Sequence, residues 1–332
     1  MQLNLFTSVL RSALAVVLSC CFVMRFPSPQ KQESGEPAPG AEIKTTAVVV
    51  NVYPIVEGRR GRLISDLGRD DFELTDNGAE QKIEYFSRET NAPLSLGILV
   101  DTSPSQARLL ATEQAAAKSF VGSVLREDDQ AFVMHFDVDV ELLQDFTNAS
   151  EKLGVAIDGA KINETGHSIV PEDARNSRRG TRLYDAVYLA SNELMKTRHG
   201  RKVMVLVTDG DDEGSKIDLR AAVEAAEKAN VIVYSIVASD AELYELLNLK
   251  YHGDSSVRKL SRETGGRTIR LKSIQDIVAA FNQISQELHS QYLLGYSPAK
   301  ARHDGSFRRI QVRIRTHNYT ARARTGYYDS RE

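Results

Sequence analysis

The chain has 332 residues, which is room for about two domains and a leader, since a domain usually holds roughly 100–200 residues. Its 42% hydrophobic and 26% charged residues are typical of a soluble globular protein with a sizeable core. The formal net charge of −3 excludes the strong basic excess that is typical of nucleic-acid-binding proteins. Both cysteines, Cys20 and Cys21, lie near the start, so the rest of the chain can form neither a disulfide framework nor a cysteine-based metal site.

Residues 1–25 are predicted to be a targeting segment. Arg11 precedes an apolar run at 12–24, which has the length of a signal-peptide core and is too short to span a membrane comfortably. Residues 17–20 (VLSC) resemble a bacterial lipobox, in which Cys20 would be lipidated; a cleaved signal peptide and an uncleaved anchor are the alternatives. We therefore expect an extracytoplasmic protein, periplasmic, secreted or lipid-anchored, that meets the membrane only through its leader or a lipid anchor.

Residues 26–42 are rich in Pro, Gln, Glu and Gly and are predicted to be a disordered linker. Residues 43–90 follow as an N-terminal β segment. Alternating, Val-rich or apolar patterns predict strands at 45–53, 71–75 and 81–86. Asn77-Gly78 between the last two is a strong hairpin signal, because both residues tolerate positive φ.

The pattern changes at about residue 91, where strands and helices begin to alternate up to residue 290. Continuous apolar runs such as residues 94–100 (LSLGILV) are typical of parallel strands that are covered on both faces. Strands are predicted at 94–100, 130–136, 138–146, 202–208, 231–237 and 267–271, and helices at 105–124, 149–160, 183–197, 219–229, 257–264 and 274–289. This order predicts an α/β fold with a doubly wound, mostly parallel sheet.

The tail returns to β structure in a C-terminal β segment, residues 291–329, with strands predicted at 292–296, 307–316 and 320–328. Neither flanking segment has enough strands to be stable alone. We therefore expect 43–90 and 291–329 to pack together as one small β-sandwich into which the α/β domain is inserted.

Polar residues cluster in three loops that follow predicted strands or open a helix: residues 101–105 (DTSPS), 180–185 (GTRLYD) and 208–212 (TDGDD). Ligand sites in open α/β sheets lie at the carboxyl ends of strands. Aspartates and hydroxyls are the oxygen ligands that Mg²⁺ prefers. Because hydroxyl ligands add no charge, an ion held in this way would remain electrophilic and would attract a carboxylate from another molecule.

The residues of these loops resemble the metal-ion-dependent adhesion site of von Willebrand factor A domains. The strings LGILVDTSPS, GTRLYDAVYLAS and KVMVLVTDGDD stand in the order and spacing of that family, and the resemblance covers about residues 93–290. With its flanks, the whole chain resembles the von Willebrand A-related proteins found in Acidobacteria.

The resemblance implies a Rossmann-like fold that holds one ion, Mg²⁺ or alternatively Mn²⁺ or Ca²⁺. The residues that it assigns to the ion are Asp101, Ser103, Ser105, Thr181 and Asp209. Ser103 and Ser105 would ligate directly, Thr181 directly or through water, and the two aspartates mostly through water. Pro104 replaces the commoner glycine, which removes a backbone donor but no ligand.

Other polar residues of these loops have weaker assignments. Asp185 is expected either as an acceptor behind the ligands or as an ordinary first-turn carboxylate, and Asp211 as part of an acidic turn at the rim. The long segment 161–180 is predicted to determine specificity, with Arg175, Arg178 and Arg179 receiving an acidic partner. The alternative is a surface loop without such a role.

These patterns favour a protein that binds a protein ligand through the metal, with an Asp or Glu carboxylate of the ligand completing the site. One alternative is a structural or assembly scaffold of an envelope complex with a degenerate metal site. The other is a metal-dependent hydrolase, but the sequence has no GxSxG elbow, no HExxH and no phosphate-binding loop. We therefore expect no enzyme and no nucleic-acid ligand, while the partner and the oligomeric state stay open.

Overall fold

The computed structural model describes residues 49–88, 92–162, 180–239, 254–299, 304–315 and 318–329, all of which belong to one compact unit, Ala47–Glu332. The predicted leader and linker lie outside the described residues. So do Cys20, the candidate lipidation site, and the three candidate partner-binding arginines, Arg175, Arg178 and Arg179.

A six-stranded sheet forms the centre of the α/β part. Its strand order is β11-β10-β9-β6-β7-β8, parallel throughout except for β8 at one edge. The strands are β6 (Leu94–Asp101), β7 (Gln130–Phe136), β8 (Val140–Thr147), β9 (Arg201–Thr208), β10 (Val231–Val237) and β11 (Thr268–Arg270). Every residue of β6, β9 and β10 is buried, as their continuous apolar runs predict for strands covered on both faces.

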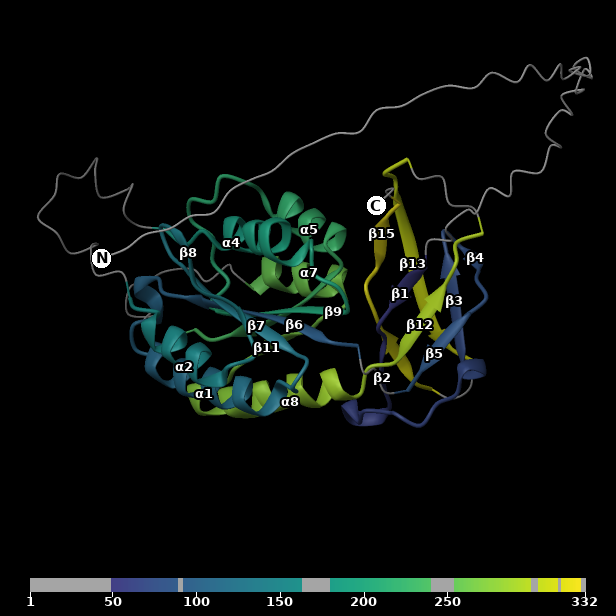
Figure 1. Cartoon of the computed structure of the whole chain (residues 1–332), viewed down its shortest axis with the longest axis horizontal. Helices are drawn as coiled ribbons and strands as arrows, with labels where there is room; N and C mark the ends of the chain where they lie inside the picture. Colours follow the sequence, from purple (N-terminus) through teal and green to yellow (C-terminus); the bar gives the residue numbers. More distant parts are fainter. Residues whose placement is uncertain are drawn as a thin grey trace, which may run out of the picture. The chain divides into compact units, whose positions relative to one another are not determined.

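Helices cover both faces of this sheet (Figure 1). One face packs against α1 (Leu110–Val124), α2 (Ser150–Gly159) and α8 (Ile277–His289). The other packs against α4 (Leu183–Leu189), which continues as a π-helical stretch η5 (Ala190–Met195), and against α5 (Leu219–Lys228) and α7 (Asp254–Thr264). The prediction of a doubly wound, mostly parallel α/β fold is confirmed. Among the described residues, no helix has the length and apolar character needed to cross a membrane.

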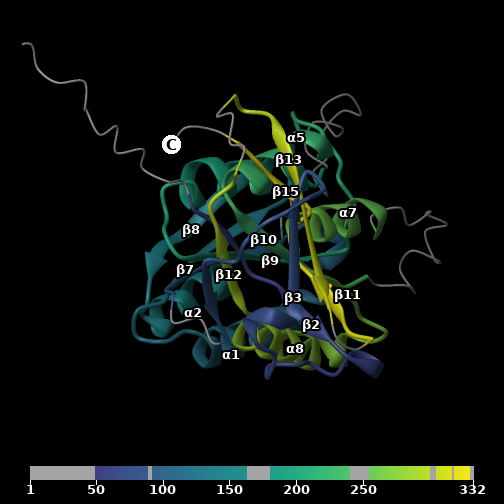
Figure 2. The same ribbon diagram turned by 90° about the vertical axis from the view of Figure 1, so that its right-hand side faces the viewer.

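The strands on either side of the α/β part pair with one another, as Figure 2 shows from the side of β3, β12 and β13. Three small sheets result, with orders β1-β12-β5, β15-β13-β3-β4 and β14-β2. Their strands are β1 (Val50–Val52), β2 (Ile55–Glu57), β3 (Phe72–Asp76), β4 (Ala79–Glu80), β5 (Tyr85–Ser87), β12 (Leu293–Tyr296), β13 (Phe307–Ile314), β14 (Thr320–Arg322) and β15 (Gly326–Tyr328). A third apolar core contains side chains from both segments, so the predicted small β-sandwich of N- and C-terminal strands is confirmed. The domain boundaries given above stay a prediction.

Two predicted strands are interrupted in the structure. Residues 81–84 are irregular, so only the end of the predicted strand 81–86 forms a strand, β5, which pairs with β12, whereas β4 just before it pairs with β3. The predicted strand 320–328 divides into β14 and β15. The apolar alternation continues where the chain passes from one sheet to the next, because Ile83 in the crossing segment is itself buried in the shared core. The Asn77-Gly78 turn is as predicted, with φ of 50° and 80°.

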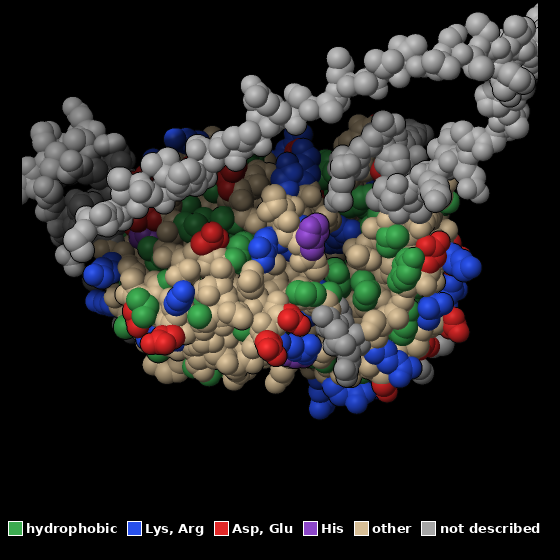
Figure 3. All heavy atoms as spheres, in the orientation of Figure 1, with side chains coloured by type: hydrophobic (Ala, Val, Ile, Leu, Met, Phe, Trp, Pro, Cys, Tyr) green, Lys and Arg blue, Asp and Glu red, His purple; other side chains and the backbone are tan. Residues whose placement is uncertain are grey.

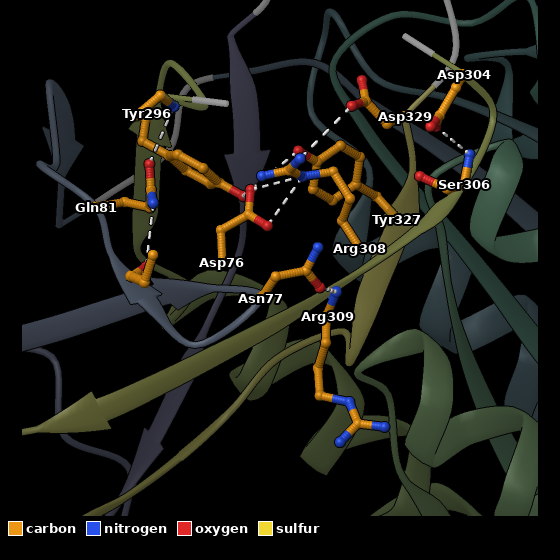
Figure 4. Close-up of polar contacts among 12 residues, drawn as sticks. Asp76, Asn77, Gln81, Tyr296, Asp304, Ser306, Arg308, Arg309, Tyr327 and Asp329 are labelled. Carbon is orange, nitrogen blue, oxygen red and sulfur yellow. Dashed lines mark hydrogen bonds and ion pairs between the residues drawn. The ribbon is translucent and has the colours of Figure 1, made fainter. Parts of the chain in front are cut away.

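We call the strands β1–β5 and β12–β15 the β part and the rest the α/β part. A buried polar cluster links the N-terminal strands of the β part to its C-terminal strands (Figure 4). The Asp76 carboxylate at the end of β3 accepts hydrogen bonds from the hydroxyls of Tyr296 (3.0 Å) and Tyr327 (3.1 Å). Arg308 Nε donates to both of its oxygens at 3.0 and 3.1 Å, and Arg308 Nη1 lies 3.7 Å from Asp329. We refer to Asp76, Tyr296, Arg308, Tyr327 and Asp329 as the Asp76 cluster.

Ion pairs join the β part to the α/β part. Glu287 of α8 is 1% exposed and pairs with Arg267 (2.7 Å) and with Arg322 of β14. Both arginines also pair with Glu57 of β2. Elsewhere, Lys and Arg side chains are interspersed with Asp and Glu over the face drawn in Figure 3, in keeping with the small net charge.

Candidate metal centre

The candidate site lies at the carboxyl ends of two neighbouring strands. Asp101 is the last residue of β6, and Asp209 directly follows β9. The two strands are parallel neighbours in which Val100 lies opposite Val207, so the loops that follow them emerge side by side. Ser103 and Ser105 lie in the first loop, where a 3₁₀ turn, η3 (Pro104–Gln106), precedes α1.

Direct hydrogen bonds link four of the predicted ligands. The hydroxyls of Ser103 and Ser105 are 3.0 Å apart, and Ser105 Oγ donates to Asp209 Oδ2 at 2.6 Å. Asp101 Oδ1 accepts from the backbone N–H of Ser103 at 2.9 Å. Asp101, Ser103 and Asp209 are 0%, 3% and 1% exposed, so this oxygen-rich cluster lies beneath the surface.

The neighbouring carboxylate disfavours the ionised form of Asp101. Burial and the nearby Asp209 carboxylate raise the pKa of Asp101 to about 7, and no cationic side chain is among the groups that shift it. Two buried carboxylates close together disfavour each other's ionised form. A divalent cation between them would remove this repulsion, and the set of carboxylate and hydroxyl oxygens suits a hard ion such as Mg²⁺.

The loop that carries Thr181 is joined to the same place through its backbone. Thr181 and Glu213 exchange two backbone hydrogen bonds of 2.8 and 2.9 Å, and Glu213 lies in the loop that begins at Asp209. Within the described residues, no hydrogen bond joins the Thr181 hydroxyl to the other four predicted ligands. Thr181 is 7% exposed, and Gly180 before it lies so close to the backbone of Glu213 that a side chain would not fit.

Asp185 and Asp211 take part in hydrogen bonds of this region in different ways. The Asp185 carboxylate accepts from Lys216 N–H (2.9 Å) and Ile217 N–H (3.2 Å), so it fixes the loop that follows Asp209. The backbone N–H of Asp211 donates to Asp209 Oδ1 at 3.1 Å. Asp211 therefore lies beside a predicted ligand, whereas Asp185 is directed towards the start of α5.

Some polar residues of this region were not predicted. Thr208 Oγ1 donates to Asp101 Oδ2 at 2.6 Å. Glu113 and Gln106 are fully buried at the start of α1 and in the turn before it. The sequence signal for Glu113 exists, because Leu110, Glu113 and Ala117 follow the spacing of one helix face, which places an acid on the apolar side of α1.

A hydroxyl, an imidazole and a carboxylate also lie in series next to the cluster. Thr102 Oγ1 is 3.1 Å from His135 Nδ1, and His135 Nε2 is 3.3 Å from Glu141. This order of groups is that of a nucleophile with its base. However, Thr102 is 0% exposed and its hydroxyl donates to Asp137 at 2.9 Å, so it is not accessible to a substrate.

The cluster differs from metal sites built from acids and imidazoles alone. Among the described residues, no group of three or more His, Cys, Asp or Glu side chains is placed to hold an ion. Two aspartates and neutral hydroxyls make up the candidate donor set instead.

The sequence profile of the von Willebrand factor type A domain matches residues 96–280. This match covers more than half of the chain and includes all five predicted ligands. The chain belongs to the von Willebrand factor type A domain family. No curated protein matches the sequence.

Among solved structures, three are similar to this chain over part of its length at low sequence identity. A von Willebrand factor type A protein from Catenulispora acidiphila is 11% identical, with 78% of this chain and 72% of that chain covered and a TM-score of 0.48. The vWF domain of the type V pili tip protein Mfa5 from Porphyromonas gingivalis is 13% identical, covering 59% and 95%, with a TM-score of 0.43. Proximal thread matrix protein 1 from the mussel byssus, with a zinc-occupied MIDAS motif, is 14% identical, covering 64% and 50%, with a TM-score of 0.46.

Proposed function

We propose that this von Willebrand factor A domain binds one divalent cation at the Asp101–Asp209 cluster and uses it to bind a protein ligand. Mg²⁺ is the expected ion, with Mn²⁺ or Ca²⁺ as alternatives. Asp101, Ser103, Ser105, Thr181 and Asp209 would hold it, and a carboxylate of the partner would complete its coordination.

The main support is that two buried aspartates, Asp101 and Asp209, lie close enough for Asp209 to raise the pKa of Asp101, with the hydroxyls of Ser103 and Ser105 beside them. Two carboxylates balance the charge of a divalent ion, and the serine hydroxyls add ligands without adding charge. An ion bound in this way keeps its attraction for one more anionic oxygen. Because no described hydroxyl in the cluster has an accessible base beside it, binding is favoured over catalysis.

The location of the protein is part of the same proposal. The apolar run at 12–24 supports export, and a partner at the cell envelope fits a binding module that lies outside the cytoplasm. The segment with Arg175, Arg178 and Arg179 stays our candidate for the part of the rim that selects the partner.

Isothermal titration calorimetry with MgCl₂ tests the proposal directly. The unaltered chain should take up one ion per molecule, and Asp101→Ala should take up none. Asp139→Ala is the matched control, because Asp139 is an exposed aspartate on a neighbouring loop whose described ion pair is with Arg182. An unaltered chain without Mg²⁺, Mn²⁺ or Ca²⁺ uptake, or equal uptake by Asp101→Ala, would refute the metal centre.

Capture of a partner from envelope extract tests the second half. Binding should require Mg²⁺, disappear with EDTA, and be absent for Asp101→Ala but present for Asp139→Ala. Metal uptake combined with capture that EDTA does not alter would favour the scaffold alternative instead.

A further inference from the structure

Glu113 on α1 is buried without a hydrogen-bonding partner. Its side chain is 1% exposed, and neither carboxylate oxygen accepts a hydrogen bond from any described residue. A buried polar group without a partner destabilises the folded state, so such groups are rare in native proteins. Leucine or methionine would fit the apolar face of α1 without this loss, so the acid calls for an explanation.

Gln106 supplies a second unpartnered oxygen in the same region. It is 0% exposed, and its Nε2 donates to the backbone oxygen of Ala238 at 3.3 Å, whereas its Oε1 accepts no hydrogen bond within the described residues. The N–H of Ala238 in turn donates to the backbone oxygen of Thr208 at 3.0 Å. The Gln106 amide is therefore fixed beside the strand end from which Asp209 emerges.

The charges around Glu113 connect it to the candidate metal centre. Burial, then Asp101, then Asp209, raise the pKa of Glu113 well above its ordinary value. The charged groups that act on it are therefore the two aspartates of the cluster, and no cation is among them. Three acids thus share one buried region at the end of the sheet.

We propose that Glu113 and Gln106 form the inner wall of the metal centre and, through ordered water, hold Asp101 and Asp209 in position around the ion. This inference rests on the proposed function. Mg²⁺ keeps several water ligands, and water bound to a cation points its hydrogen atoms outward. The surrounding protein must therefore offer acceptors, and the free oxygens of Glu113 and Gln106 are acceptors in a buried place.

Glu113 is then a positioning residue rather than a ligand. Residues that orient metal ligands typically change metal affinity by 10- to 100-fold when they are replaced. If Glu113 had no relation to the ion, replacing it would only remove an unfavourable buried acid. The two explanations therefore agree on the stability of the metal-free protein and differ on the affinity for the ion.

The test uses the full chain with Glu113→Met, Glu113→Gln and the control Glu151→Gln, an exposed acid in the first turn of α2. Thermal unfolding in EDTA and calorimetric titration with MgCl₂ are measured for each. Glu113→Met should melt about 3 °C higher than the unaltered chain in EDTA but bind Mg²⁺ at least about tenfold more weakly. Glu113→Gln keeps one acceptor oxygen and should recover part of the affinity, and Glu151→Gln should change neither quantity.

The outcomes separate this inference from the proposed function. An unaltered chain that takes up no ion overturns both. If the unaltered chain takes up the ion and both Glu113→Met and Glu113→Gln bind it with the same affinity as the unaltered chain, only the proposed role of Glu113 is overturned. A lower melting temperature of both Glu113 variants in EDTA also overturns it, because the acid would then stabilise the metal-free fold. Should Glu113→Met fail to fold, Glu113→Gln, with nearly the same size and shape, decides the question.

Discussion

Two buried aspartates in this chain have opposite surroundings. Asp76 in the β part is 1% exposed and Asp101 in the α/β part is 0% exposed. Asp76 receives hydrogen bonds from one guanidinium and two tyrosine hydroxyls, so its charge is compensated by the protein itself. Asp101 receives a hydroxyl and a backbone N–H and faces another carboxylate. Asp76 therefore has a cationic partner, whereas no cation is among the groups that shift the pKa of Asp101.

The difference indicates what each cluster does. Compensated buried charges hold segments in register, and removing one partner leaves another charge stranded. Uncompensated ones are costly to the fold and cluster at functional sites. We therefore expect the Asp76 cluster to stabilise the fold, and we propose binding for the Asp101–Asp209 cluster; four measurements can break or sharpen this distinction.

The largest effect is expected for Asp76→Ala. It leaves Arg308 buried without its main partner and frees two tyrosine hydroxyls, which should lower the free energy of unfolding by about 3–5 kcal/mol. Urea denaturation in EDTA and in Mg²⁺ measures it, and the loss should be the same in both. A loss that depended on Mg²⁺ would contradict the assignment of this cluster to stability.

Asp101→Asn should give the reverse pattern. Asparagine keeps the shape of the side chain and one of its two acceptor oxygens, and it removes one of two neighbouring carboxylates, so stability in EDTA should be equal to or higher than that of the unaltered chain. Mg²⁺ at one hundred times its dissociation constant should stabilise the unaltered chain by about 2.7 kcal/mol and leave the variant unchanged. If Asp101→Asn unfolded as easily as Asp76→Ala in EDTA, the two aspartates would not differ in role.

Glu227 on α5 offers an intermediate case. It is 7% exposed beside a cavity of about 270 Å³ between α5 and β15, and burial followed by Glu263 raises its pKa to about 7. A carboxyl whose folded pKa is raised contributes stability below its unfolded pKa, and that contribution is lost as pH rises towards the folded value. Between pH 5 and 7 the unaltered chain should lose about 2 kcal/mol more than Glu227→Gln.

Urea denaturation at several pH values, with EDTA present, measures this difference. Glu151→Gln, which replaces an exposed acid, should follow the unaltered chain at every pH. Parallel pH profiles for Glu227→Gln and the unaltered chain would show that Glu227 is better compensated than its surroundings indicate.

The smallest effect is expected for Tyr327→Phe. It removes one of the hydrogen bonds to Asp76 and should lower the free energy of unfolding by about 1.5 kcal/mol, since the acceptor is charged. Tyr328→Phe is the neighbouring control, because Tyr328 contacts Lys228 through its ring rather than its hydroxyl. Equal losses for the two variants, measured by the same denaturation, would mean that the hydroxyl bond to Asp76 has no special weight.

The sequence predicts the parts of this molecule that depend on local pattern. The apolar runs of β6 and β9 and the position of the loops after them predict the fold and the proximity of Asp101 and Asp209. From the sequence, Asp76 can be recognised only as the residue before the predicted Asn77-Gly78 turn. Its partners Tyr296 and Arg308 lie 220 and 232 residues further along the chain, so no local pattern reveals that it is buried.

Glu113 and the divided strands were missed for a different reason. The sequence alone does not show whether an acid among the apolar residues of a helix is buried or exposed, because the surface that packs against the helix is unknown. The alternation of apolar and polar residues likewise continues through residues 81–86, although the chain passes there from the sheet of β3 to the sheet of β12. In both cases the missing information is which surface packs against the segment, and only the tertiary structure supplies it.

The pairing of β3 with β13 has a consequence for biosynthesis. At about 5–20 residues per second, a ribosome takes about 10–50 s to travel from Asp76 to Arg308. During that time β1, β3 and β5 have been made but the strands that cover them have not, while the intervening α/β part can already fold. The edge of β3 that pairs with β13 in the finished protein then exposes unpaired backbone N–H and C=O groups to other chains. We expect nascent chains halted before residue 307 to depend on chaperones and to aggregate more readily than the finished protein.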